Sequence, residues 1–330
     1  MKAAYILQTG GAENIIYGDL PQPACGANQC LIKVGAVDVN PVDIYIRSGA
    51  VPAKMNFPYI LGRDLAGTVA QTCAKAKRFK TGDRVWAVGQ GWDGRQGTFS
   101  EFAALDEGWL NPIPEKVSDE EIAAISLVGI TAHVGLMAKA KLKAGEILFV
   151  NGGSGGVGSS VVQMAKILGA RVITTAGGAE KVAAVKHLGA DCVIDYKTEN
   201  VVEAVKRIAP GGVNVWWETL REPDFEKTIP LLALHGRMIV MAGRDARPPF
   251  PVGLFYAKNC SLYGFVILNS APDELRSAAE DINRWMTAGK LKARIDRVLP
   301  LSQTADAHRL QEQSTIKKTS ALAGKIVLKP

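Results

Sequence analysis

Short apolar runs alternate with amphipathic stretches through the middle of the chain, between residues 146 and 264. Each run is continuous or nearly so, which is typical of strands buried on both faces of a parallel sheet. The runs read EILFVNG, RVITTAG, DCVIDY, VNVWWETL and GRMIVMAG. Four segments between them have the length and pattern of crossover helices: residues 157–168, 179–188, 200–208 and 223–234. This repeated order predicts a doubly wound α/β sheet, which residues 259–266 extend by one more strand.

The first hundred or so residues follow a different pattern. Short strands such as CLIKVGAVDV, AGTVAQT and DRVWAVG are separated by Gly and Pro turns, which predicts a partly open β-barrel. Residues 116–140 are helical, with Ser118 and Glu121 at the spacing of a capping box, and join the two parts. After a helix over residues 272–288, the strand-like RIDRVLPL and GKIVLKP are expected to return to the barrel.

Length and charge support a two-domain protein that binds small molecules. A chain of 330 residues exceeds the usual size of a single core, so we expect two domains, the barrel of residues 1–121 and 267–330 and the doubly wound domain of residues 122–266. The net charge of +7 is spread along the chain, which favours anionic small molecules over a dedicated nucleic-acid face. No apolar run approaches the length needed to span a bilayer, and we expect no secretory signal. The cysteines described next favour a cytoplasmic protein.

The five cysteines are odd in number and scattered, which favours reduced thiols over a disulfide framework. They are Cys25, Cys30, Cys73, Cys192 and Cys260. Cys25 and Cys30 are spaced closely enough to raise the alternative of a metal pair. No second Cys pair or nearby His completes a tetrahedral site, so we expect no metal there.

The stretch NGGSGGVGSS, residues 151–160, contains the pattern G-x-G-x-x-G between a predicted strand and a predicted helix. Glycines allow the backbone to approach a pyrophosphate, whose charge meets free N–H groups and the positive end of the helix. The alternative is a tight turn without a ligand. The predicted contacts from this loop are Ser154, Gly155, Gly156 and Val157.

The end of the second strand of the sheet, ITTAGGAEK, indicates which dinucleotide binds. NAD-type sites place an acidic residue here to accept hydrogen bonds from the ribose hydroxyls. Gly177 and Gly178 occupy this place, and Lys181 can supply a counter-charge to a 2′-phosphate, which favours NADPH over NADH. Tyr196, at the end of the third strand, is placed to reach the adenosine. Lys181 as a solvated helix residue and Tyr196 as an ordinary strand-end residue remain alternatives.

Six stretches together carry a resemblance to a known family: VNPVDIYIRSG, PYILGRDLAGTV, KTGDRVWA, GITA, NGGSGGVGSSVVQMAKILGARVI and GKIVL. On these the chain resembles the medium-chain dehydrogenase/reductase superfamily over essentially its whole length. More narrowly, it is similar to the zinc-independent quinone oxidoreductase branch, the relatives of zeta-crystallin. The resemblance implies a GroES-like barrel as catalytic domain, a Rossmann domain that binds NADPH, and a homodimer that pairs through residues 259–266.

The chain departs from the zinc-dependent members of that superfamily. Those relatives carry a Cys before a Thr-Asp or Ser-Asp pair and then a Gly-His-Glu, which supply zinc ligands. This chain has NPVD at the first place and GRD at the second, and Arg63 would repel a cation. The four histidines are not paired at ligand spacing. We therefore expect no catalytic metal.

The resemblance also implies roles for single residues. It places Asn40, Asp43 and Tyr45 near the nicotinamide and the substrate, with Tyr45 the best candidate for donating a proton to the substrate oxygen. Arg47 or solvent are rivals for that role, and the alternative for Asn40 and Asp43 is that they only hold their loop. Further cofactor contacts implied are Thr131, Ala242, Gly243, Arg244, Phe265 and Val266.

Together these observations predict an NADPH-dependent oxidoreductase that transfers hydride to quinones or α,β-unsaturated carbonyls (enones and enals) without zinc. One alternative is an enoyl-thioester (2-enoyl-CoA) reductase, and another is an RNA-binding or crystallin-like protein without catalysis. Five aromatic residues are candidates for stacking on a ring substrate, although core packing suits most of them better. They are Trp86, Trp92, Phe99, Trp216 and Trp217.

Overall fold

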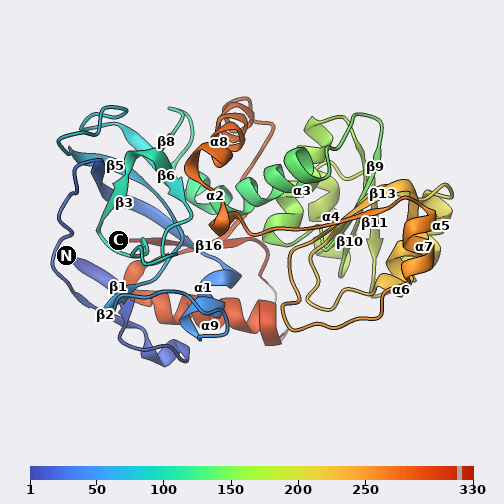
Figure 1. Cartoon of the computed structure of the whole chain (residues 1–330), viewed down its shortest axis with the longest axis horizontal. Helices are drawn as coiled ribbons and strands as arrows, with labels where there is room; N and C mark the ends of the chain where they lie inside the picture. The colour runs from blue at the N-terminus through green and yellow to red at the C-terminus, as the bar shows by residue number, and fades with distance from the viewer. Residues whose placement is uncertain (318–321) are drawn as a thin grey trace. The chain divides into compact units, whose positions relative to one another are not determined.

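The computed structural model describes residues 1–317 and 322–330. The chain forms two compact units, one made of Met1–Leu127 with Leu268–Pro330 and the other of Val128–Ile267. The colours of Figure 1 show that the first unit combines the start of the chain, in blue, with its end, in red. The sequence placed these boundaries after residues 121 and 266. Helix α2 (Asp119–His133) runs through the first boundary.

Unit 1 is built on the long strand β3 (Gln29–Val39). Its main sheet has the order β15-β16-β3-β5-β6-β8, with β7 also paired to β3, and a smaller sheet has the order β2-β1-β4. The pairing of β3 with β5 shifts register at two places, and such irregularities bend strands toward a barrel. The other strands are β1 (Lys2–Ile6), β2 (Ile16–Asp19), β4 (Tyr59–Ile60), β5 (Asp64–Thr72), β6 (Arg84–Val88), β7 (Phe102–Asp106), β8 (Asn111–Pro112), β15 (Ile295–Pro300) and β16 (Lys325–Lys329).

The end of the chain returns to unit 1, as the sequence predicts. Strand β16 lies parallel to β15 and antiparallel to β3, with Ile326 opposite Val39. The predicted helix after residue 271 is confirmed as α8 (Pro272–Thr287). Unit 1 also contains α1 (Pro41–Arg47), α9 (Thr304–Glu312) and, among its short helical turns, the 3-10 helix η2 (Glu107–Trp109).

Unit 2 contains the predicted doubly wound sheet, with six parallel strands in the order β11-β10-β9-β12-β13-β14. The apolar runs are buried because helices cover the sheet; Phe149 and Trp216 stack at 3.9 Å between ring centroids within its core. Its strands are β9 (Ile147–Asn151), β10 (Arg171–Ala176), β11 (Cys192–Asp195), β12 (Val213–Glu218), β13 (Leu232–Val240) and β14 (Ser261–Gly264). Its helices are α3 (Gly156–Ile167), α4 (Ala179–His187), α5 (Val201–Ile208), α6 (Phe225–Thr228) and α7 (Val252–Ala257).

Two predictions of secondary structure differ in outcome. The capping box at the start of α2 is confirmed, because Glu121 N donates to Ser118 Oγ at 3.2 Å and Ser118 N donates to Glu121 Oε2 at 2.9 Å. The helix predicted over residues 223–234 is wrong for most of its length. Only α6 and a 3-10 turn form there, and β13 already begins at Leu232. Pro230 has no N–H for a continuing helix, and the strand gains a parallel partner in β12.

The expectation that no apolar run is long enough to span a membrane is wrong. The helix Asp119–Lys139 passes that test by length and composition, with a mean hydropathy of 1.6. No Asp, Glu, Lys or Arg occurs between Glu121 and Lys139. Of the apolar window, 72% is buried within the protein, and the core helix of a soluble protein has the same property.

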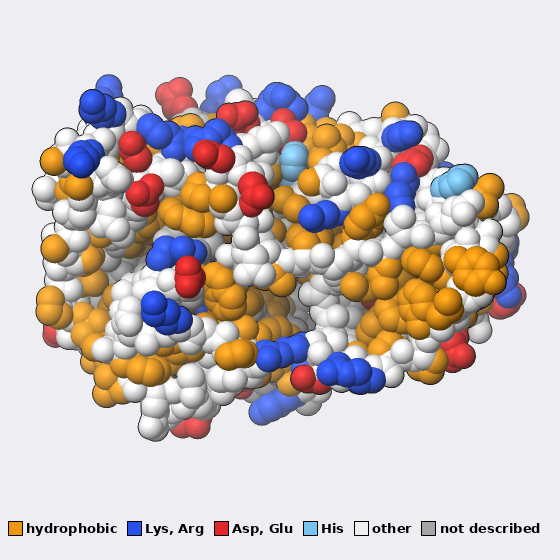
Figure 2. Space-filling model, in the orientation of Figure 1, with side chains coloured by type: hydrophobic (Ala, Val, Ile, Leu, Met, Phe, Trp, Pro, Cys, Tyr) orange, Lys and Arg blue, Asp and Glu red, His pale blue; other side chains and the backbone are white. Residues whose placement is uncertain are grey.

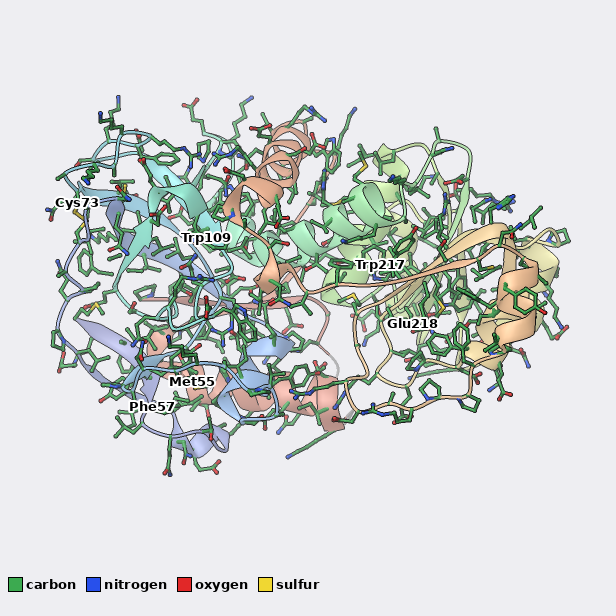
Figure 3. The ribbon with its side chains drawn as sticks, viewed as in Figure 1. Met55, Phe57, Cys73, Trp109, Trp217 and Glu218 are labelled. Carbon is green, nitrogen blue, oxygen red and sulfur yellow. A yellow bond between two sulfur atoms is a disulfide. The ribbon has the colours of Figure 1, made fainter. Side chains whose placement is uncertain are left out.

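The expectation that all thiols are reduced is wrong for two cysteines. Cys25 and Cys73 form a disulfide, and Cys73 is labelled in Figure 3. Cys73 follows β5 and its N–H donates to Gln29 O at 3.1 Å, so the pairing of β5 with β3 brings the two residues together. Cys30 is buried and free, which also removes the alternative of a Cys25–Cys30 metal pair. Cys192 and Cys260 are free as well.

Candidate active site

The glycine loop lies between β9 and α3 and contains glycines of two kinds. A β-carbon at Gly153 would lie 2.2 Å from Thr174 Oγ1, and one at Gly158 would lie 2.1 Å from Gly152 O. These glycines are required by close packing inside the unit. A β-carbon at Gly155 would meet nothing closer than Gly152 O at 3.6 Å. The exposed backbone at Gly155 is therefore open to a ligand, which fits the approach of a pyrophosphate.

Helix α3 begins directly after this open position. Gly155 is its N-cap residue, with extended backbone, and no side chain in the described part of the chain caps the helix there. The N–H groups of the first turn and the positive end of the helix dipole therefore face outward from the loop. Gly156 and Val157 contribute these groups, and Ser154 precedes them in the turn. The loop residues predicted from the sequence thus form one continuous anion-binding turn, and the structure fits a dinucleotide phosphate there.

A buried carboxylate holds the residue that precedes the glycine turn, and no sequence pattern pointed to it. Glu218, at the end of β12 and labelled in Figure 3, is 2% exposed. Asn151 Nδ2 donates to both of its oxygens, at 3.0 and 3.1 Å, and Trp216 Nε1 and Leu220 N donate at 3.1 and 2.8 Å. Burial raises the pKa of Glu218, while these hydrogen bonds oppose the rise. Glu218 therefore fixes Asn151, the last residue of β9 before the glycine turn.

The turn between β10 and α4 presents Gly177 and Gly178 where an acid would bind a ribose. Gly178 has φ of +90° and its N–H donates to Asp195 Oδ1 at 3.0 Å, as does Lys197 N at the same distance. The hydrogen bond from Gly178 N–H is the main cause that lowers the pKa of Asp195. This acid, although near, is therefore engaged by backbone groups.

Tyr196 and two lysines surround the same turn. A β-carbon at Gly177 would lie 2.4 Å from Tyr196 Oη, so the Tyr196 side chain covers Gly177 while remaining 55% exposed. Lys181 lies in the first turns of α4. Lys197 Nζ would lie 3.9 Å from a β-carbon at Gly178, and the sequence reasoning missed this lysine. Its only signal was its position directly after Tyr196.

The predicted contacts at the other strand ends of unit 2 are present as loop and helix residues. Ala242 and Arg244 flank Gly243, which has φ of +85° and lies against Arg221 O. Phe265 packs edge-on against Trp217, with 6.5 Å between ring centroids, and Val266 follows it at the surface. Thr131 lies in α2 and is nearly buried.

In unit 1, Asn40 and Asp43 are brought together at the start of α1. Asn40 N donates to Asp43 Oδ2 at 2.7 Å, the geometry of a helix cap. The Asn40 side chain is fully buried and donates to Asp38 Oδ1 at 2.5 Å and Asp64 Oδ2 at 2.9 Å, while Lys325 Nζ donates to Asn40 Oδ1 at 2.7 Å. Both amide hydrogens are thus used inside the unit. The alternative that these two residues hold the loop is favoured, and contact with substrate stays a prediction.

The acids around Asn40 carry strongly altered pKa values. Burial raises the pKa of Asp38 to about 6, against the opposing attraction of Lys325, whose Nζ lies 2.9 Å from Asp38 Oδ2. Burial and the nearby charge of Asp38 raise the pKa of Asp64 well above its ordinary value. One lysine therefore serves two buried carboxyls, and a proton on Asp64 relieves their repulsion.

Arg63 belongs to the GRD stretch, which the resemblance matches to the Gly-His-Glu of zinc-dependent relatives. Its guanidinium is fully buried, with Nε 3.5 Å from Asp43 Oδ1 and Nη1 2.8 Å from Tyr59 Oη. Arg47, further along α1, forms an ion pair with Glu312 of α9. Both arginines are therefore engaged within unit 1. Tyr45 lies half-buried on α1, and its role as proton donor stays a prediction.

The aromatic candidates divide clearly between core and surface. Trp86, Phe99, Trp216 and Trp217 are buried, so the interpretation as core residues is confirmed for these four. Trp92 is partly exposed and lines a pocket of unit 1 together with Trp109, which the sequence reasoning did not single out.

Comparisons with known proteins match this architecture. Residues 26–115 match the family model of the alcohol dehydrogenase GroES-like domain, and residues 156–284 match that of the zinc-binding dehydrogenase. The quinone oxidoreductase of Homo sapiens is 32% identical over 99% of this chain and 97% of its own length. That of Pseudomonas aeruginosa is 30% identical over 91% and 92%, respectively.

Solved structures show the same fold. The quinone oxidoreductase of Escherichia coli complexed with NADPH superposes with a TM-score of 0.87 at 26% identity, covering all of both chains. A structure described as an NAD-dependent alcohol dehydrogenase gives 0.90 at 28% identity with the same coverage. The expected combination of a GroES-like and a Rossmann unit is confirmed. The chain belongs to the quinone oxidoreductase family of the medium-chain dehydrogenase/reductase superfamily and is an oxidoreductase.

Proposed function

We propose that this protein is an NADPH-dependent reductase that transfers hydride to quinones or α,β-unsaturated carbonyls without a catalytic zinc ion. The observation that carries the proposal is the turn after β10. It presents Gly177 and Gly178 in place of a ribose-binding acid, with Lys181 and Lys197 beside it. Two ammonium groups, next to an Asp195 carboxylate that backbone N–H groups already bind, favour the additional 2′-phosphate of NADPH over the bare hydroxyl of NADH.

The residues of unit 2 fit the remainder of the cofactor. The open backbone at Gly155 and the first turn of α3 would hold the pyrophosphate, and Tyr196 would lie along the adenine. Glu218 keeps the loop in this form through Asn151. NADPH, when bound, supplies a hydride, which carries both electrons of the reduction.

The buried charges of unit 1 support the zinc-free part of the proposal. Arg63 and Lys325 place two cations among the acids that a divalent cation would otherwise attract. Without a Lewis acid, an alkoxide formed from an alcohol loses its usual stabilisation, whereas a quinone or enone is already electrophilic. Tyr45 would donate a hydrogen bond or a proton to the oxygen on which negative charge develops.

Steady-state kinetics of the whole protein test the proposal. We expect reduction of 1,4-naphthoquinone or an enal with NADPH, a much higher KM for NADH, and no loss of activity with a chelator. Lys181→Gln and Lys197→Gln are each expected to raise the KM for NADPH about tenfold, which corresponds to about 1.4 kcal/mol, and to leave that for NADH unchanged.

Lys186→Gln, an exposed change on the same helix α4, is the matched control and should alter neither KM. Equal KM values for the two nucleotides in the unmodified protein would contradict the assignment of NADPH. Faster turnover of a 2-enoyl-CoA than of any quinone or enal would replace the proposed substrate class.

A further inference from the structure

Unit 1 contains a pocket of about 580 Å³ whose walls are aromatic and basic. Trp92 and Trp109 provide aromatic surface, Lys54 and Arg95 provide positive charge, and Leu268 forms an apolar part of the lining. Asp93 is the acidic residue of this lining. Trp109 is labelled in Figure 3. Two cations against one acid give the pocket a net positive charge.

The aromatic and basic groups are held in fixed positions. The Arg95 guanidinium lies over the ring of Trp109, with 4.8 Å from Cζ to the ring centroid, and its Nη2 donates to Gly89 O at 3.0 Å. A β-carbon at Gly89 would lie 2.9 Å from the Trp109 ring, so the Gly89 backbone packs closely against this ring. A stacked pair of this kind presents a flat surface and a charge together.

The second basic group belongs to a loop that is attached to the first. Gly94 N donates to Lys54 O at 3.2 Å, and Asn56 Nδ2 donates to Gly94 O at 3.0 Å. The Lys54 side chain runs along Gly94, because its Cδ would lie 3.5 Å from a β-carbon there. Lys54 and the loop that carries Trp92 and Arg95 therefore form one preorganised wall, which lowers the entropic cost of binding a ligand.

Two stretches of the pocket lining are close in the sequence to residues of the proposed site. Residues 52–54 follow α1, which carries Tyr45, by a few positions. Residues 268–271 begin two positions after Val266, which the resemblance assigns to the cofactor together with Phe265.

We propose that the pocket binds a planar aromatic ring that carries an acidic group, with the ring against Trp92 and Trp109 and the anion at Lys54 and Arg95. Resting on the proposed function, this identifies a quinone bearing a sulfonate or carboxylate as the preferred substrate class. The quinone would take up one hydride and one proton and leave as the hydroquinone, while NADPH becomes NADP⁺. Ring stacking supplies contact area, and the cations distinguish an anionic quinone from a neutral one.

Calorimetric titration with ligands that cannot be reduced tests the binding site alone. We expect naphthalene-2-sulfonate to bind about tenfold more tightly than its neutral isostere naphthalene-2-sulfonamide, about 1.4 kcal/mol. Lys54→Gln and Arg95→Gln should each weaken sulfonate binding severalfold and leave sulfonamide binding unchanged. Lys54 is exposed, so its variant keeps the test decisive if Arg95→Gln does not fold.

Arg284→Gln is the matched control, because Arg284 also lies over an aromatic ring of unit 1, that of Trp285 at 6.0 Å, outside the pocket. It should change neither affinity. Equal affinities for sulfonate and sulfonamide, or an unchanged ratio in both pocket variants, would overturn the proposal. So would loss of sulfonate binding in Lys181→Gln, since that would assign the anion to the nucleotide site.

Turnover separates this inference from the proposed function. In the unmodified protein, the KM for 1,4-naphthoquinone-2-sulfonate should lie below that for 1,4-naphthoquinone, and Lys54→Gln should remove most of the difference without changing the KM for NADPH. If neither quinone is reduced with NADPH, the proposed function fails, and the calorimetric ratio still decides the pocket. If both are reduced with the same KM in protein and variant, only the substrate preference fails.

Discussion

Lys325 donates a hydrogen bond to Asn40 at 2.7 Å, although the two residues lie 285 positions apart in the sequence. The same ammonium group lies 2.9 Å from Asp38 Oδ2, and Asp64 accepts from Asn40 on the other side. Strand β16, from the end of the chain, thus neutralises acids that surround the start of α1. The loop that leads to Tyr45 depends on this contact.

Removal of the lysine charge should therefore destabilise the protein strongly. Lys325→Met leaves the Asp38 carboxylate buried without its cation, and breaking a buried ion pair on one side typically costs about 3–5 kcal/mol. The free energy of unfolding from urea titration measures the loss. Lys329→Met, on the same strand but exposed and paired with Glu120, is the control and should cost about 1 kcal/mol or less.

The raised pKa values of the same acids predict how stability depends on pH. With the pKa of Asp38 near 6 in the folded protein, the folded state binds more protons than the unfolded chain between about pH 4 and pH 6. The contribution of this cluster to stability is therefore greatest in acid and falls as the pH rises through that window. Asp64→Asn should flatten this slope and be nearly neutral at pH 7, because Asp64 is the carboxyl with the more strongly raised pKa. Urea titrations from pH 4 to pH 7 measure how the free energy of unfolding depends on pH. An unchanged slope in Asp64→Asn would contradict a raised pKa of Asp64.

Substitutions at two glycines of the loop should have different effects, one on folding and the other on cofactor binding. Gly158→Ala would place a β-carbon 2.1 Å from Gly152 O and should destabilise the fold by several kcal/mol. Gly155→Ala meets only a contact of 3.6 Å and has a φ of −74°, so its thermal unfolding should be close to that of the unmodified protein. Its new methyl group should obstruct the pyrophosphate and raise the Kd for NADPH at least tenfold. If Gly155→Ala binds NADPH with an unchanged Kd, the pyrophosphate does not lie against Gly155.

Glu218 should affect the loop without contacting a ligand. Glu218→Gln replaces one carboxylate oxygen by an NH₂ group, which cannot accept a hydrogen bond. The variant therefore loses the bond from Asn151 to that oxygen, together with the bond from either Trp216 or Leu220. We expect a loss of about 1–3 kcal/mol in stability together with a higher KM for NADPH at nearly constant kcat. Glu203→Gln, exposed on α5, provides the control. A loss of stability with an unchanged KM would show that Glu218 is only a core residue.

The edge of the sheet in unit 2 predicts a homodimer. Strand β14 is the last in its sheet, and apolar side chains gather in Figure 2 over the part of unit 2 that carries α6 and α7 in Figure 1. The exposed apolar residues of this region include Val252, Leu254, Tyr256, Leu262 and Val266. An unpaired apolar edge favours pairing with a second copy.

Light scattering after size-exclusion chromatography measures the assembly. The unmodified protein should have twice the mass of one chain, and Leu262→Lys should shift it toward the monomer. Leu7→Lys, an equally polar change at an exposed apolar residue of unit 1, should not. A monomeric unmodified protein would contradict the prediction.

Local patterns predicted most of the fold because each element is encoded by neighbouring residues. The strands of unit 2 followed from continuous apolar runs, and the capping box of α2 from the spacing of Ser118 and Glu121. The same local reasoning extended a helix over residues 223–234, since it could not weigh Pro230 and the pairing of β13 with β12 against helical pattern.

Contacts between distant segments were not predictable in this way. The Cys25–Cys73 disulfide depends on the register between β3 and β5, and Lys325 reaches Asn40 only because β16 inserts beside β3. Glu218 looked like one more residue of an apolar strand, and Lys197 became part of the candidate site only through the turn at Gly178. In each case the missing information was which strands lie next to each other.

The late position of β16 has a consequence for synthesis of the protein. All of unit 2 leaves the ribosome before β16, and domains generally fold as units during translation. Until residues 325–329 pair between β15 and β3, the sheet of unit 1 is incomplete, and Asp38 and Asp64 lack the positive charge of Lys325. Strand β16 can pair with β15 and β3 only after residues 325–329 have left the ribosome, so unit 1 completes its sheet after all of unit 2 has been made.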